Sequence, residues 1–250
     1  MTAVVGIFCH DGIVIGSDSS ATFTAAQKQP TIEQKVKKVE IVGGQVILAG
    51  TGAVGLGQRF KELLTDYWTG KKGSGKSPTT IAKDLCALAI EDFAATKVEK
   101  GTYGALVAFP CAGKIHLCEF ATTDFQPEFK NTNMWFVSMG SGQAITDPFL
   151  GLMRRVFWGD TPPHLNEGIF AVTWTLKHVI ELNPGGIAPP AQIAVLDANK
   201  KQARLLTDEE IQEHINNAEG AEKHLQSYRD ILQGKKGEAI PLPPSSPPQI

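Results

Sequence analysis

The second residue of the chain, Thr2, carries a hydroxyl group directly after Met1. Threonine is small enough for routine removal of an initiator methionine, and Thr2 would then carry a free α-amine. A hydroxyl is a weak nucleophile at neutral pH, and an α-amine with an ordinary pKa of about 8 is suited to take its proton. Thr2 therefore combines a nucleophile and a general base in one residue.

The residues after Thr2 predict a β-hairpin that returns the chain to the threonine. Two β-branched runs, Val4–Phe8 and Ile13–Ser17, are separated by turn-forming residues. Asp18 follows the second arm, so it should lie beside Thr2 if the two arms pair. A lysine from the next strand, such as Lys38, would then complete a set of nucleophile, acid and cation.

A second hairpin should place that lysine. Residues 35–42 and 45–50 read as strands joined across Gly43-Gly44, and this dipeptide is a strong short turn signal. Lys38 is expected on the first of these strands. From the sequence alone, a solvated pair on a sheet edge is the favoured interpretation of Lys37 and Lys38, and the family resemblance described below reverses it for Lys38.

Four short motifs occur in the order seen in the proteasome β-subunit and HslV family of N-terminal threonine peptidases. They are GIVIGSDSSAT at 12–22, VKKV at 36–39, LAG at 48–50 and MGSG at 139–142. The chain resembles this bacterial proteasome-like family over residues 2–205. The resemblance implies an α+β fold, the four-layer αββα sandwich of N-terminal nucleophile (Ntn) hydrolases, with the active site at one end between the sheets.

The resemblance also implies catalytic roles for five residues. Thr2 would attack a peptide carbonyl, and its own amine would accept and return the proton. Lys38 would place a positive charge beside the hydroxyl, and Asp18 would orient Lys38. Ser141 would hydrogen-bond the amine of Thr2, and the backbone N–H of Gly50 would stabilise the oxyanion.

Substrate binding is carried over from the same motifs. Thr22 would bind the substrate backbone, and Ala21, Val36 and Leu48 would line a pocket that prefers an apolar side chain. Three positions depart from the family pattern. Gln143 replaces a small residue after the Gly-Ser-Gly turn, and Glu181 and Pro184 stand where Asp and Ser usually surround the threonine amine.

Two glycine-rich segments match nucleotide-binding patterns by letter, GxGxxG at 50–55 and GxxxxGK[ST] at 70–77. The first needs a strand, a helix and a parallel strand, but two helices are expected here, at 55–68 and 78–98. The second needs a buried strand before the loop, whereas helical periodicity precedes it. We therefore interpret both as structural connections and expect no cofactor.

The remaining periodicity predicts a polar loop at 23–34 and then strands and helices in blocks. The strands are expected at 103–109, 114–120, 133–138, 192–196 and 203–206, and the helices at 147–157 and 165–182. Blocks without strict strand-helix alternation favour antiparallel sheets covered by helices. Residues 2–206 would form one Ntn-hydrolase domain, 207–233 an amphipathic helix, and 234–250 a Pro-rich disordered tail.

Composition limits the classes of function. The chain has 250 residues, 42% apolar content and a net charge of −2, so it can bury a large core and lacks the basic field of a nucleic-acid binder. No apolar run is long enough to cross a membrane.

The four cysteines form no CxxC pair, which favours reduced thiols in a cytoplasmic protein. A thiol nucleophile at Cys9 beside His10 is disfavoured, and no histidine spacing indicates a metal.

These observations predict a threonine-type endopeptidase that forms stacked homo-oligomeric rings and acts on polypeptides, with an ATP-dependent unfoldase as a partner. Two alternatives remain. The chain would be a catalytically silent structural ring subunit if activity was lost, or an Ntn amidase if it acts on small amides.

Overall fold

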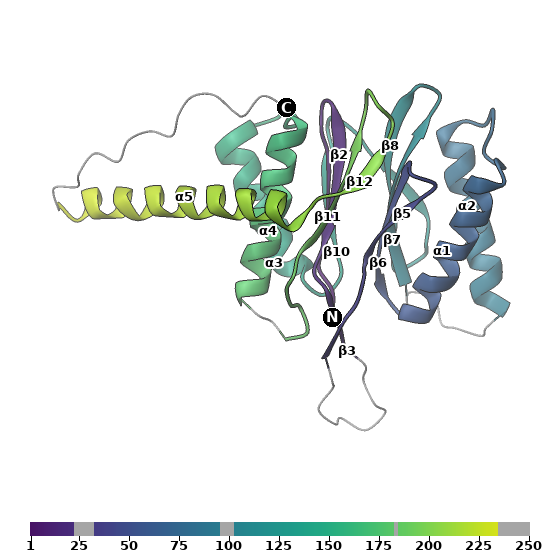
Figure 1. The fold of residues 1–250 in the computed structure, drawn as a ribbon, viewed down its shortest axis with the longest axis horizontal. Helices are drawn as coiled ribbons and strands as arrows, with labels where there is room; N and C mark the ends of the chain where they lie inside the picture. The colour runs from purple at the N-terminus through teal and green to yellow at the C-terminus, as the bar shows by residue number, and fades with distance from the viewer. Residues whose placement is uncertain (23–32, 96–102, 183–184, 235–250) are drawn as a thin grey trace.

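Four layers make up the computed structural model, which describes residues 1–22, 33–95, 103–182 and 185–234. Two five-stranded sheets are stacked face to face, and helices cover the outer face of each sheet (Figure 1). This arrangement confirms the predicted α+β sandwich of Ntn-hydrolase type.

The first sheet holds the N-terminal hairpin at its centre. Its order is β10 (Phe136–Met139), β1 (Val4–Phe8), β2 (Gly12–Ser17), β11 (Gln192–Asp197) and β12 (Ala203–Leu205), with every pair antiparallel. Val4 pairs with Ser17, so the residues before β1 and after β2 meet at one end of the sheet. The predicted hairpin therefore returns the chain to Thr2 as expected.

The second sheet lies against the first. Its order is β5 (Val39–Val42), β6 (Val46–Gly52), β7 (Tyr103–Cys111), β8 (Lys114–Phe120) and β9 (Pro127–Lys130), again antiparallel throughout. A small pair of strands, β3 (Ser20–Thr22) and β4 (Glu33–Lys35), projects from the same end as the N-terminus (Figure 1).

Three apolar cores hold the layers together. The core between the sheets includes Ile15, Ile47 and Leu106, each fully buried. A second core joins the first sheet to α3 (Gln143–Met153), the π-helical turn η1 (Arg154–Trp158) and α4 (Leu165–Leu182). A third joins the other sheet to α1 (Val54–Thr69) and α2 (Pro78–Ala95). Both faces of each sheet are thus buried, which explains its near-continuous apolar strands.

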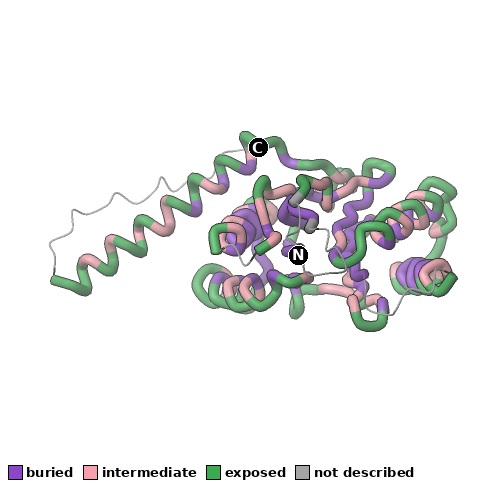
Figure 2. Tube along the Cα trace, turned by 90° about the horizontal axis from the view of Figure 1, so that it is seen from below, coloured by how far each residue is buried: buried purple, intermediate pink, exposed green. Residues whose placement is uncertain are grey.

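The last helix, α5 (Asp208–Leu232), is attached to the domain by its residues up to Glu222, whose carboxylate accepts from Trp174 Nε1 at 2.9 Å. Thr207 caps it through the predicted capping box with Glu210, and Ile211 and Ala218 are buried. The rest of the helix extends away from the sandwich and is mostly exposed (Figure 2). No helix in the described residues is long and apolar enough to span a membrane.

Several predicted boundaries were wrong. Lys38 was expected within a strand but lies one residue before β5, because the residues at 36–38 pair with no neighbouring strand. β4 and β9 were not anticipated; β4 occupies part of the predicted loop, of which 23–32 lie outside the described residues. The helix expected at 147–157 begins at Gln143 and ends in η1. Residues 96–98 of the second helix and the tail from 235 also lie outside the described residues.

The two nucleotide-binding patterns occupy structural connections, as predicted. Residues 50–55 join β6 to α1, but β7 runs antiparallel to β6, so the parallel strand of a dinucleotide-binding unit is missing there. Residues 70–77 connect α1 to α2 rather than a strand to a helix.

Candidate active site

Thr2, Lys38 and Asp18 meet at one end of the sandwich. The ammonium of Lys38 donates to the hydroxyl of Thr2 at 3.1 Å and to the two carboxylate oxygens of Asp18 at 2.8 and 3.0 Å. The side chain of Lys38 is 9% exposed and that of Asp18 is fully buried. Since water is largely excluded, the attraction between these charges is stronger than at a surface.

The carboxylate of Asp18 is held by the backbone around it. Its oxygens accept hydrogen bonds from the N–H groups of Ala3 at 2.9 Å, Ser20 at 2.9 Å and Ala188 at 3.4 Å. Backbone N–H donors compensate for the loss of hydration on burial, so the position of this carboxylate is well determined.

Gln192, on β11 of the first sheet, fixes the segment that carries Lys38. Its side-chain oxygen accepts from the backbone N–H groups of Lys38 at 3.0 Å and Val39 at 3.2 Å. Its side-chain nitrogen donates to the Val36 carbonyl at 2.7 Å and to the Ser19 hydroxyl at 2.6 Å. One amide thus supplies the partners that the missing strand pairing at 36–38 would otherwise provide.

The glycine-flanked turn at 140–142 packs directly on the backbone of Thr2. The Thr2 N–H donates to Ser141 Oγ at 3.1 Å, and the Gly142 N–H donates to the Thr2 carbonyl at 3.1 Å. Gly140 has φ +92°, and a Cβ there would lie 2.3 Å from the Thr2 carbonyl oxygen. The sequence places glycine where neither the backbone conformation nor the space admits another residue.

Met1 precedes Thr2 in the structure, so the nitrogen facing Ser141 is an amide. The Met1 carbonyl accepts from the Thr2 hydroxyl at 2.8 Å and from Lys38 Nζ at 3.3 Å. The Met1 carbonyl thus shares the donors of the site with Asp18, which accepts from the same Lys38 ammonium.

Gly50 lies on β6, on the cleft side of the second sheet. A Cβ at this position would lie 2.3 Å from the hydroxyl oxygen of Tyr103 and 2.7 Å from its ring. Burial raises the pKa of Tyr103 above its ordinary range, so the phenol remains neutral. Gly50 thus lines the cleft at a position where a side chain would overlap Tyr103.

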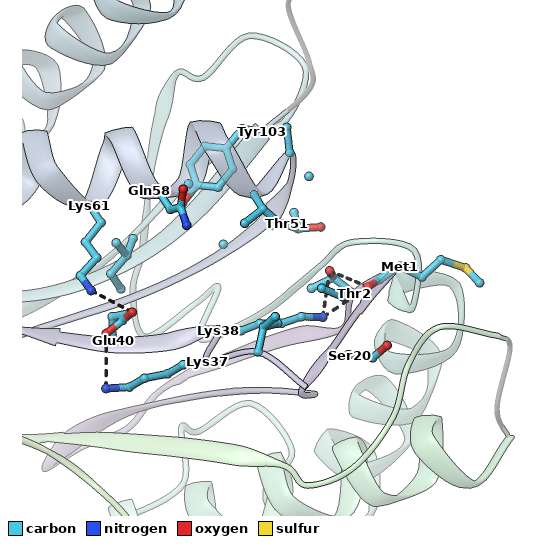
Figure 3. Close-up of a pocket in the computed structure, with 18 residues that line it drawn as sticks. Met1, Thr2, Ser20, Lys37, Lys38, Glu40, Thr51, Gln58, Lys61 and Tyr103 are labelled. Atoms are coloured by element: carbon cyan, nitrogen blue, oxygen red, sulfur yellow. Dashed lines mark hydrogen bonds and ion pairs between the residues drawn. The ribbon is translucent and has the colours of Figure 1, made fainter. Parts of the chain in front are cut away.

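A cleft of about 590 Å³ opens beside Thr2, and Figure 3 shows its lining. Three of the four predicted substrate-binding residues, Ala21, Val36 and Leu48, line it together with Lys38 and Gly50. Thr22 pairs with Glu33 through the backbone, and its side chain lies outside the described residues.

Other residues of the site were not found from the sequence. Gln192 and Tyr103 carry no motif, because their contacts come from strands distant in the chain. Ser20 is 1% exposed, lines the cleft and has no hydrogen-bond partner for its Oγ among the described residues. The position of Ser20 directly after the Asp-Ser pair was the one sequence feature that could have indicated its place in the site.

The three departures from the family pattern differ in their relation to the site. The Glu181 carboxylate pairs with Lys177 at 2.9 Å on the exposed side of α4. Gln143 lies in the first turn of α3, and its amide donates to Asp147 at 3.0 Å. Pro184 lies outside the described residues.

Cys9 is 1% exposed in the core beneath α4, and burial raises the pKa of its thiol well above the ordinary range. Such a thiol is a poor nucleophile. Among the described residues, no group of three or more His, Cys, Asp or Glu side chains is arranged to hold a metal ion.

A model of the proteasome subunit family matches residues 2–150, which is more than half of the chain. The chain belongs to the proteasome subunit family. The matched region includes Thr2, Asp18, Lys38, Gly50 and Ser141, so the site described above lies within the family domain. No significant match occurs among curated proteins.

Among solved structures, this family member is similar to Anbu, the ancestral β-subunit from Yersinia bercovieri. The two chains share 14% sequence identity with a TM-score of 0.68, and the match covers 96% of this chain and 100% of the Anbu chain. At this identity the similarity establishes the proteasome-like fold. The chain is therefore a proteasome-like subunit.

Proposed function

We propose that this chain is a threonine-type endopeptidase that uses Thr2 as its N-terminal nucleophile. The observation that carries the proposal is the position of Lys38, whose ammonium contacts both Thr2 Oγ at 3.1 Å and Asp18 at 2.8 Å. A structural subunit has no need of a buried ammonium against a threonine hydroxyl, because burying that charge costs free energy.

Removal of Met1 would convert the Thr2 amide into an α-amine beside Ser141 Oγ. Thr2 Oγ attacks the carbonyl carbon of a peptide bond while the amine, directly or through a water, takes the hydroxyl proton. Lys38 favours the ionised hydroxyl by its charge, and Asp18 keeps Lys38 charged and oriented.

The tetrahedral intermediate carries an oxyanion that the Gly50 N–H stabilises. Its collapse breaks the C–N bond, and the proton held by the Thr2 amine passes to the leaving amine. Water then attacks the resulting ester with the same amine as base, which releases the acid product and regenerates Thr2.

The assembly proposed with this activity is a stacked homo-oligomeric ring. Family membership supports a ring subunit, and enclosure of the sites would limit access to unfolded polypeptides. An ATP-dependent unfoldase is the partner that such an enclosure requires. The four free cysteines favour a reducing compartment, and we assign the protein to the cytoplasm.

The division of the chain is part of the same proposal. Residues 2–206 form the Ntn-hydrolase domain, and 207–233 form an added helix whose first turns pack on α4. The segment 234–250 is assigned as a Pro-rich tail from its composition, and all of it after residue 234 lies outside the described residues.

The test is intact mass and N-terminal sequencing of the purified protein after incubation with a β-lactone or epoxyketone. The expected result is a protein that begins at Thr2 and gains one covalent adduct on that residue. The adduct should disappear in Thr2→Ala and persist in Thr79→Ala, a change at an exposed threonine on α2. A protein that retains Met1, or that forms no adduct, would contradict the proposal.

Size-exclusion chromatography and substrate size distinguish the two alternatives. A ring that cleaves peptides but forms no product from small amides supports the endopeptidase. An adduct on Thr2 in a monomer that hydrolyses only small amides would indicate an amidase. A ring with no adduct would indicate a structural subunit.

A further inference from the structure

The end of the cleft farther from Thr2 is lined by charged residues from two elements. Lys61 on α1 pairs with Glu40 Oε1 at 2.9 Å, and Lys37 pairs with Glu40 Oε2 at 3.3 Å. In Figure 3 this trio lies on one side of Lys38, and Thr2 and Met1 lie on the other. Gln58, also on α1, adds an amide to the lining.

The trio has an unbalanced charge. Two ammonium groups share the single carboxylate of Glu40, so one positive charge remains after both pairs are formed. Lys38 adds no net charge to the cleft, since the Asp18 carboxylate neutralises its ammonium. The side chain of Glu40 is 22% exposed, whereas Lys37 and Lys61 are 56% and 44% exposed, so the ammonium groups are more accessible to an incoming group than the carboxylate is.

Apolar residues line the same cleft as the nucleophile and this trio. They are Ala21, Val36 and Leu48. A side chain that enters beside Thr2 and extends along the cleft would thus contact apolar walls with its stem and cations with its tip. Each ammonium carries three N–H donors, so a lysine paired to Glu40 can also donate to a second carboxylate.

The occupant of the cleft follows from the reaction. The residue whose carbonyl is attacked at Thr2 has its own side chain closest to the lining, so the cleft binds the residue on the N-terminal side of the scissile bond. Given the proposed endopeptidase function, we infer that Lys37, Glu40 and Lys61 make the enzyme prefer glutamate at that position. This adds a cationic end to the apolar pocket expected from Ala21, Val36 and Leu48.

The trio should disfavour a basic substrate residue at this position more strongly than an apolar one. A lysine or arginine would bring a third cation to a trio whose one carboxylate is already shared, and like charges at contact distance are unfavourable. Leucine would fill the apolar part of the cleft but would leave the cations solvated. Aspartate has the required charge on a shorter stem, so it should be cleaved less well than glutamate.

The experiment uses fluorogenic peptides that differ only at the residue before the scissile bond, which is Glu, Gln, Leu or Lys. We expect kcat/KM for the Glu peptide to exceed that for the Leu peptide about threefold to tenfold, the range for a partly exposed charge contact. The Lys peptide should be the poorest. Raising the salt concentration to 1 M should reduce the Glu-to-Leu ratio, because exposed charges are screened.

Two variants of the trio and one control test whether the trio causes the preference. Lys61→Gln removes the excess charge, and the Glu-to-Leu ratio should fall to about one, while Glu40→Gln increases the excess and should raise the ratio about threefold. The matched control is Lys83→Gln, which removes an exposed lysine from α2 outside the cleft. It should leave the ratio unchanged.

Two results are distinguishable. If Thr2 forms the adduct and the Leu peptide is preferred, or Lys61→Gln leaves the ratio unchanged, the inference is wrong and the endopeptidase remains. If no peptide is cleaved and no adduct forms on Thr2, the proposed function is wrong and this preference falls with it.

Discussion

Lys38 Nζ lies 2.8 Å from Asp18 Oδ1, and three backbone N–H groups hold the same carboxylate in a fully buried position. Asp18→Asn should therefore reduce stability as well as activity. Removing one partner of a buried ion pair leaves the other charge uncompensated, which costs about 3–5 kcal/mol. Chemical denaturation measures this loss, and Asp66→Asn, a change at an exposed position on α1, should show none.

The same substitution should lower kcat for peptide cleavage by about a hundredfold, because a displaced Lys38 no longer faces Thr2 Oγ. Lys38→Met should have a similar effect, and the double variant should be no worse than the poorer single one. Additive losses would show that Asp18 and Lys38 act independently.

Gln192 should act as a positioning residue. Gln192→Ala leaves the backbone N–H groups of Lys38 and Val39 without their acceptor, and an unpaired buried N–H costs about 1–3 kcal/mol. We expect kcat to fall about tenfold while KM changes little, since the displaced group is Lys38 rather than the substrate-binding walls. Gln226→Ala, an exposed change on α5, is the control. A loss confined to KM would contradict this role.

Gly50→Ala should reduce the free energy of unfolding because of Tyr103. The added methyl group would overlap the Tyr103 hydroxyl and ring, and overpacking of this kind costs about 1–3 kcal/mol. Tyr103→Ala should itself destabilise the protein, but in that background Gly50→Ala should cost much less. A double-mutant cycle on the free energy of unfolding tests this coupling, and equal costs in both backgrounds would contradict the contact.

Gly55→Ala should increase the stability of the protein, in contrast to Gly50→Ala. Gly55 lies in the first turn of α1, and no atom lies within 4 Å of the position that its Cβ would take. Alanine in a helix is favoured over glycine by about 0.5–1 kcal/mol, so the variant should unfold at a higher temperature than the wild type. Peptide cleavage should be retained.

Acidification should weaken the attachment of α5. His214 is 8% exposed in the first half of the helix, its Nδ1 has no partner among the described residues, and burial lowers its pKa. The unfolded chain therefore binds the proton first, and stability falls as the pH drops below the ordinary value of about 6.5 toward the lower folded pKa. His214→Leu should reduce this pH dependence of denaturation, whereas Gln212→Leu on the same helix should not.

The candidate active site was predictable because its residues lie in motifs beside turns. The Asp-Ser pair after β2 and the Gly-Ser-Gly turn after β10 have local patterns, and hairpin pairing returns Asp18 to Thr2. The sandwich was predictable from blocks of strands and helices and from the family resemblance. The return of Asp18 required only pairing between neighbouring segments, whereas the Ser141–Thr2 contact spans 139 positions and was implied by the family resemblance.

Contacts between distant segments were missed where no family motif marks the residue. Gln192 reaches Lys38 across 154 positions of sequence, and no periodicity indicates a side chain that replaces strand pairing. The expected strand through Lys38 failed for the same reason, since a β-branched run predicts a strand without showing whether a partner strand is adjacent. Lys37 was interpreted as a solvated lysine, and Glu40 and Lys61 were not singled out, because their common cleft exists only after α1 packs beside β5.

The two stacked sheets each deliver part of the reactive centre. Thr2 and Asp18 flank strands of one sheet, whereas Lys38 and Gly50 come with the other. The spacing of nucleophile and ammonium is consequently set by the thickness of the apolar layer formed by residues such as Ile15, Ile47 and Leu106. Methyl groups far from any substrate thus set the distance between the Thr2 hydroxyl and the Lys38 ammonium, and we expect their truncation to reduce the proposed activity even in variants that still fold.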